Sequence, residues 1–172
     1  NMSRINPPYR ADVVGSFLRP DVLKQARADF AAGVIDEAAL RAVEDEAIHD
    51  LVAKQKAAGL HVITDGEFRR SMWHLDFLTE LLGCEEVGAE HWSVHFKGHQ
   101  PKSKTVVITD KVDFGEHPFL KHFAFTNSVA GGTLVKQTIP SPTMLHLICC
   151  VREENYTPIA RYENNEELLF AD

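Results

Sequence analysis

The chain has 172 residues and a formal net charge of −7, with 44% hydrophobic and 25% charged residues. This composition is typical of one globular domain with a real core. The negative charge argues against a broad nucleic-acid or anionic-membrane surface, because both need a positive field, and no apolar run approaches the ~20 residues of a membrane span. Three cysteines form no disulfide framework and no signal peptide is evident, so we expect a reduced, cytoplasmic setting.

The first half of the chain is predicted to alternate strands and helices. The expected elements are a strand at Asp12–Val14, a helix at Asp21–Ala32, a helix at Glu37–Ala58 and a strand at His61–Thr64. Gly33 and Gly59 stand where the helices end, and Asp36 stands where the second helix begins, as helix caps do. A helix followed by a strand indicates a parallel sheet.

The second half is less regular and contains a predicted β-hairpin. The expected elements are a helix at Ser71–Leu82, strands at His91–Phe96 and Thr105–Phe114, a helix at His117–Phe125, a strand at Thr133–Ile139, a helix at Thr143–Cys149 and a helix from Glu163. The two middle strands, joined by a polar connection, would form a hairpin insertion at about residues 91–115.

Polar residues stand where two predicted parallel strands end. Gly15 and Ser16 follow the first strand, and Asp65-Gly66-Glu67 follows the strand at His61–Thr64. In parallel α/β folds the chemistry lies at the carboxyl ends of the strands. Ser16 and Glu67 are therefore the first candidates for a site, although Asp65-Gly66 also has the composition of a simple turn.

Three segments of the chain carry more specific motifs. They are V-G-S-F-L-R-P at Val14–Pro20, D-G-E-F-R-R-S-M-W-H-L-D-F at Asp65–Phe77 and K-Q-T-I-P-S-P at Lys136–Pro142. In this order they resemble the cobalamin-independent methionine synthase family, and most closely its short members that keep only the catalytic barrel. The resemblance implies methyl transfer from a methylated folate to the thiol of homocysteine, in a (β/α)8 TIM barrel whose zinc ion binds that thiol as thiolate.

The resemblance also implies roles for residues at the strand ends. Gly15 and Ser16 would lie against the carboxylate of homocysteine or methionine, and Gly66-Glu67, with Asp65 in the same turn, would hold the ammonium group. A hydroxyl and backbone N–H groups suit a carboxylate, and a carboxylate suits an ammonium group.

The residues that follow on the same loop have two interpretations. Arg69, Trp73 and His74, together with Arg70, would face a folate-like acid or its pterin ring. The structural alternative is an ion pair with Glu67 and a packed tryptophan.

The zinc centre that the resemblance implies is expected outside this chain. The family's ligands are a His-x-Cys pair, a Glu and a distant Cys in the second half of the barrel, and 172 residues cannot close a barrel of ~250 residues. We therefore expect residues 1–172 to form an incomplete N-terminal half of the barrel, as a short gene product or as a fragment, without a metal site. His91, His95 and His99 would spread over ~26 Å on a strand, too far for one ion.

Three functions remain open at this point. The first is a methyltransferase-family segment that keeps the amino-acid end of the pocket. The second is a related thiol alkyltransferase, for example one acting on coenzyme M, against which Glu67 argues because that thiol has no ammonium group. The third is a non-catalytic half-barrel. Because an incomplete barrel leaves open sheet edges, we expect a homo-oligomer or completion by a second segment; whether the chain alone is an active enzyme stays open.

Overall fold

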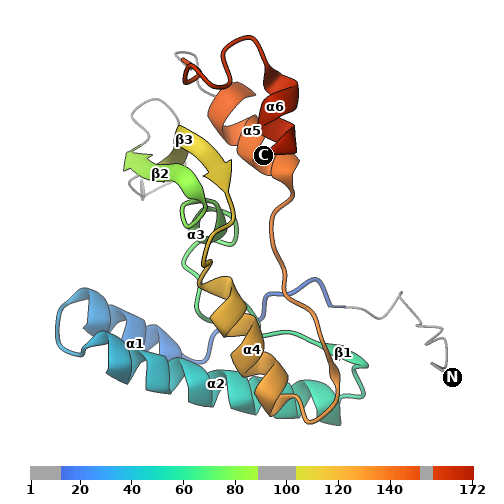
Figure 1. Cartoon of the computed structure of the whole chain (residues 1–172). Helices are drawn as coiled ribbons and strands as arrows, with labels where there is room; N and C mark the ends of the chain where they lie inside the picture. The colour runs from blue at the N-terminus through green and yellow to red at the C-terminus, as the bar shows by residue number, and fades with distance from the viewer. Residues whose placement is uncertain (1–12, 89–103, 152–156) are drawn as a thin grey trace, which may run out of the picture. The chain divides into compact units, whose positions relative to one another are not determined.

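The computed structural model describes residues 13–88, 104–151 and 157–172, and is a mixed α/β structure (Figure 1). It divides into two compact units. The first unit combines residues up to 70 with 119–138, and the second combines residues 71–118 with 139–172. Each unit is therefore described by itself.

The first unit holds both long helices that the sequence predicts. Its elements are α1 (Asp21–Ala31), α2 (Glu37–Ala57), β1 (Val62–Ile63), α4 (Phe119–Val129) and β4 (Leu134–Val135). The Asp36 carboxylate caps α2 by accepting from the Ala39 N–H at 2.8 Å, which confirms the predicted cap. Gly33 and Gly59 follow the two helices with positive φ angles, as predicted.

The sheet of the first unit is a parallel pair, β1 with β4, in which Ile63 lies opposite Val135. The predicted strand at Thr133–Ile139 is too long, because only Leu134–Val135 meets β1. Helix α2 contacts α1, α4 and β1. One core joins these elements, and its buried members are Leu23, Ala47, Ile48, Leu51, Val52, Ile63, Phe68 and Ala130.

The predicted strand at Asp12–Val14 is corrected by the structure. Asp12 lies outside the described residues, and neither Val13 nor Val14 is in a strand. The parallel relationship itself is confirmed slightly further along the chain, where an isolated bridge joins Ser16 and Gly66. The segment is therefore aligned with β1 without forming a strand.

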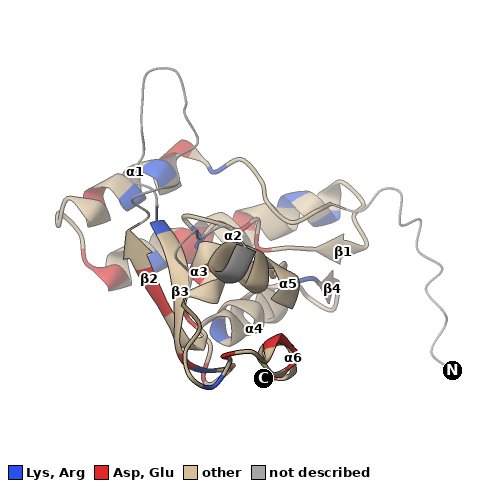
Figure 2. Ribbon diagram, turned by 90° about the horizontal axis from the view of Figure 1, so that it is seen from above, with Lys and Arg blue, Asp and Glu red and all other residues tan. Residues whose placement is uncertain are grey.

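The second unit is built around an antiparallel hairpin. Its elements are α3 (Leu75–Leu78), β2 (Leu82–Gly88), β3 (Lys104–Asp113), α5 (Pro142–His146), a π-helical turn η2 (Leu147–Val151) and α6 (Glu166–Ala171). The predicted helices after Pro142 and near the C-terminus are thus present. Figure 2 shows that β2 and α6 both carry acidic residues.

The predicted helix at Ser71–Leu82 is wrong in extent. Only Leu75–Leu78 is helical, and Leu82 already belongs to β2, which pairs with β3. The second strand of the hairpin is close to its predicted position, whereas the strand expected at His91–Phe96 lies outside the described residues. Pairing with β3 therefore accounts for the C-terminal end of the predicted helix, where Leu82 joins β2.

In the described parts of the chain, no helix is both long and apolar enough to cross a membrane.

Candidate functional site

The turn after β1 holds Glu67 in an unusual backbone conformation. Gly66 and Glu67 both have positive φ angles, 68° and 58°. A non-glycine residue in this region costs roughly 1–2 kcal/mol, and such strain persists where the surroundings enforce it, often at functional sites. Here Asp65 Oδ1 accepts from the Glu67 N–H at 2.9 Å, and the Glu67 carbonyl accepts from the Arg70 N–H at 3.1 Å.

The structure brings Gly15 and Ser16 to this turn. The Thr64 hydroxyl donates to the Gly15 carbonyl at 2.6 Å, and Ser16 forms its parallel bridge with Gly66. A Cβ atom added to Gly15 would lie 3.3 Å from Glu67 Oε1. The Glu67 carboxylate therefore lies against Gly15, as it must if the two strand ends share one site.

The segment after β4 adds two residues of the third motif to this site, and neither had a role predicted from the sequence. Thr138 donates from its hydroxyl to the Val14 carbonyl at 3.2 Å, and Lys136 donates from Nζ to the carbonyl of Val13. Their position directly after a parallel strand was the signal that could have identified them.

Arg70 supplies the positive charge beside Glu67. Its guanidinium forms an ion pair with Glu67 Oε1 at 3.7 Å, donates to the Thr138 carbonyl and lies 4.5 Å from the centre of the Phe119 ring. The ion pair that the sequence offered as an alternative is thus made by Arg70. Since 3.7 Å exceeds hydrogen-bond length, this contact leaves the carboxylate able to accept from another donor.

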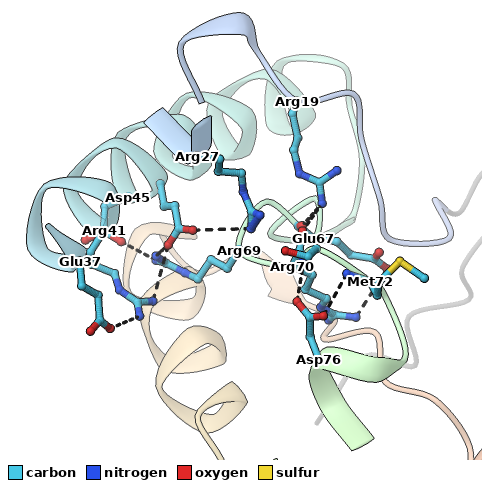
Figure 3. Close-up of polar contacts among 12 residues, drawn as sticks. Arg19, Arg27, Glu37, Arg41, Asp45, Glu67, Arg69, Arg70, Met72 and Asp76 are labelled. Carbon is cyan, nitrogen blue, oxygen red and sulfur yellow. Dashed lines mark hydrogen bonds and ion pairs between the residues drawn. The ribbon is translucent and has the colours of Figure 1, made fainter. Parts of the chain in front are cut away.

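A second arginine holds the backbone of the same turn. Arg19 Nη2 donates to the carbonyl oxygen of Glu67 at 2.9 Å and to that of Arg70 at 2.5 Å. Figure 3 shows Arg19 reaching from its own segment to this turn. Arg19 lies within the first motif, but no role was predicted for it from the sequence.

Arg69 is directed to α2. Its side chain, 3% exposed, pairs with Glu44 at 3.0 Å and donates to Asp45, while its guanidinium lies 5.0 Å from the centre of the Phe125 ring. Figure 3 shows Arg69 extended toward Asp45 and Arg41. The structure thus engages Arg69 in an ion-pair cluster on α2, and its predicted role in substrate binding stays a prediction.

Trp73 and His74 belong to the second unit. Their rings contact each other with centroids 4.8 Å apart, and Trp73 is exposed. The Asp76 carboxylate accepts from the Ser71 and Met72 N–H groups and so orders the segment before α3. The role of Trp73 and His74 in facing a folate ring stays a prediction.

The described residues do not fit the zinc centre that the family resemblance implies. Among them, no three His, Cys, Asp or Glu side chains are grouped so that they could hold a metal ion, and His91, His95 and His99 lie outside the described part of the chain. Cys84 and Cys149 are buried, and the Cys149 thiol donates to the Val106 carbonyl at 3.1 Å. Burial raises the pKa of the Cys84 thiol to about 11, so it is protonated near neutral pH and a poor ligand.

Residues 10–154 match the model of the family described as "Cobalamin-independent synthase, Catalytic domain". The chain belongs to this family. The resemblance inferred from the three motifs is therefore confirmed.

Curated relatives extend the match. Uncharacterized protein YxjG of Bacillus subtilis (strain 168) is 42% identical over 91% of this chain and 41% of its own length. The methionine synthase of Sulfurisphaera tokodaii is 29% identical over 79% of this chain and 39% of its own length. The chain thus spans about two fifths of the length of these relatives.

Solved structures agree with the assignment. A candidate vitamin-B12-independent methionine synthase from Listeria monocytogenes is 40% identical, with a TM-score of 0.74 over 96% of this chain and 44% of its own length. A B12-independent methionine synthase from Shewanella sp. W3-18-1 has a TM-score of 0.60 at 15% identity, covering 92% of this chain and 43% of its own, which is a likeness of fold alone.

Proposed function

We propose that this chain provides the amino-acid end of a methyl-transfer site, with homocysteine as acceptor and a methylated folate as donor. The observation that carries the proposal is the position of the Glu67 carboxylate, which lies against Gly15 in a turn fixed by hydrogen bonds. Membership of the cobalamin-independent synthase family supports the same reaction. As a fold, residues 1–172 are proposed to be the N-terminal half of a (β/α)8 barrel with a hairpin insertion.

The chemistry of these residues matches the two charged groups of an α-amino acid. Glu67 would accept hydrogen bonds from the ammonium group, and its 3.7 Å separation from Arg70 leaves room for a shorter contact. The Gly15-Ser16 segment would receive the carboxylate through backbone N–H groups and the Ser16 hydroxyl. Arg69 is given no contact with the amino acid in this proposal, since Glu44 and Asp45 already engage it.

The acceptor sulfur is not assigned to any described residue. A zinc ion in this family's catalytic domain holds that sulfur as thiolate, but the described residues supply no ligand set for it. We therefore assign binding of the amino acid to these residues and no step of the transfer itself. We also propose a reducing, cytoplasmic compartment, because three cysteines in 172 residues make no disulfide framework.

Calorimetry and ligand-observed NMR with methionine and homocysteine test the proposal. Without a metal–sulfur bond we expect a dissociation constant on the order of millimolar, or ~4 kcal/mol. Glu67→Gln keeps the shape and removes the charge, so affinity should fall at least about tenfold. The control is Glu46→Gln on the exposed surface of α2, and thermal unfolding shows whether each variant stays folded.

Two outcomes would contradict the proposal. A folded wild-type chain that binds neither amino acid at several millimolar would favour the non-catalytic half-barrel. Equal affinity for coenzyme M and homocysteine would favour a related thiol alkyltransferase, because a sulfonate thiol offers no ammonium group to Glu67.

A further inference from the structure

We propose that Arg19 is a positioning residue that clamps the Glu67 turn and thereby fixes the Glu67 carboxylate where it receives an ammonium group. The inference rests on the proposed function, because it explains how the strand-end turn is held ready for an amino acid. Arg19 would not touch that ligand and would act only through Glu67.

The contacts of Arg19 are suited to a clamp. One nitrogen, Nη2, donates to two carbonyl oxygens, that of Glu67 at 2.9 Å and that of Arg70 at 2.5 Å. These carbonyls lie at the two ends of the Glu67–Arg70 turn, which the Arg70 N–H closes by donating to the Glu67 carbonyl at 3.1 Å. The guanidinium therefore joins both ends of the turn from a segment 48 residues earlier in the chain.

The turn needs this support because of its backbone. Glu67 has a φ of 58°, and an L-residue with a Cβ atom disfavours that region by roughly 1–2 kcal/mol. A relaxed Glu67 would adopt a negative φ, which would swing the carboxylate away from Gly15. A hydrogen bond to the Glu67 carbonyl opposes this rotation, because the rotation of the adjoining peptide moves that oxygen.

Arg19 is itself well anchored. Two residues earlier, the Phe17 N–H donates to the Gly66 carbonyl at 3.1 Å, next to the Ser16–Gly66 bridge. On its other side, Pro20 precedes α1, and its carbonyl accepts from the Leu23 N–H at 3.0 Å. A long flexible side chain loses less entropy on binding when its backbone is already fixed and its donor group is planar.

Hydrogen exchange in the ligand-free chain tests the clamp directly. In Arg19→Ala, the Glu67 and Arg70 amides should exchange about tenfold faster, since the turn loses two charge-assisted hydrogen bonds. Amides in the middle of α2 should keep their rates, and so should all amides in Lys24→Ala, which removes an exposed cation from α1. Unchanged exchange at Glu67 and Arg70 in Arg19→Ala would overturn the clamp.

Ligand selectivity tests the purpose of the clamp. Methionine and 4-(methylthio)butanoate differ only by the amino group. A misplaced Glu67 carboxylate should therefore weaken the binding of methionine but not the binding of 4-(methylthio)butanoate. Arg19→Ala should lower methionine affinity about tenfold and leave the analogue within about twofold. Arg19→Lys keeps the charge but loses the planar donor geometry. Its methionine affinity should therefore lie between that of the wild type and that of Arg19→Ala. An equal loss for both ligands would overturn positioning in favour of general damage.

A double-mutant cycle separates this inference from the proposed function. In a Glu67→Gln chain, Arg19→Ala should cause no further loss of methionine affinity, because Arg19 acts only through Glu67; an additive loss would overturn the inference while the proposed function stands. A wild-type chain that does not bind methionine would overturn the proposed function, and with it the role of Arg19 in holding an ammonium site.

Discussion

Gly15 is the residue at which the candidate site leaves least room. A Cβ atom there would lie 2.1 Å from Thr138 Oγ1 and 3.3 Å from Glu67 Oε1, so both side chains would have to shift. Gly15→Ala should lower the free energy of unfolding by roughly 1–3 kcal/mol and abolish methionine binding. Urea unfolding and calorimetry measure the two effects. Gly88→Ala is the control, because no atom of the described residues lies within 4 Å of its added Cβ. Equal losses of stability and of methionine binding in the two variants would contradict the crowding predicted at Gly15.

Cys84 predicts a dependence of stability on alkaline pH. Burial raises the pKa of its thiol from 9.0 to about 11, so the unfolded chain releases the proton at lower pH than the folded chain. The stabilisation is therefore complete below pH 9 and declines as the pH rises from 9.0 toward about 11. Urea unfolding across this range should show the decline, and Cys84→Ala should flatten it. If the free energy of unfolding of Cys84→Ala falls with pH as steeply as that of the wild type, other groups cause the decline.

Among the elements, α2 and the turn after β1 are joined by a buried ion-pair cluster. Arg69 and Glu44 pair at 3.0 Å with side-chain exposures of 3% and 6%. Removing Arg69 leaves Glu44 only the longer contacts with Arg27 at 3.9 Å and Arg41 at 3.8 Å. Arg69→Met should therefore lower the free energy of unfolding by about 3 kcal/mol, the lower end of the range for breaking a buried pair. Urea denaturation measures this change.

Arg41→Met is the matched control for the cluster. Arg41 reaches the same Glu44 at 3.8 Å, but its side chain is 42% exposed. Exposed pairs contribute about 0–1 kcal/mol. A loss in Arg41→Met as large as that in Arg69→Met would show that burial does not set the strength of this cluster.

The elements with local signals were predictable from the sequence, and those with long-range partners were not. The cap at Asp36 and the glycine at position 33 fix the helix ends through contacts within a few residues. The Ser71–Leu82 segment has helical spacing of its apolar residues, yet it ends in β2 because Leu82–Gly88 pairs with β3. No local pattern reports that pairing.

The same distinction applies to the candidate site. Gly15, Ser16 and Glu67 were predictable because each follows a parallel strand or its equivalent, and the structure does bring them together. Arg19 was not predicted because it donates to two backbone carbonyls about 50 residues away. Every residue has a backbone carbonyl, so the residue types in the sequence do not indicate such partners.

On the scale of the whole molecule, the first unit exposes large apolar side chains. Val14, Leu18 and Leu134 are 83%, 96% and 51% exposed, and β1 and β4 form a sheet of only two described strands. Apolar surface beside an open edge favours association. We therefore expect light scattering to show at least a dimer at micromolar concentration.

A charged substitution tests which surface is responsible. Leu18→Glu combined with Leu134→Glu should shift the chain to monomer, whereas Ala53→Glu on the exposed side of α2 should not. A wild-type monomer at micromolar concentration would contradict the expected association.

The segment before Arg19 is held by side chains that come from much later in the chain. Lys136 and Thr138 bind the carbonyls of Val13 and Val14, across 123 and 124 residues of sequence. During synthesis at roughly 5–20 residues per second, this segment is synthesised about 6–25 s before its partners. The candidate site therefore cannot form before Lys136 and Thr138 have been synthesised, and a ribosome that stalls before Lys136 leaves a nascent chain without these two contacts.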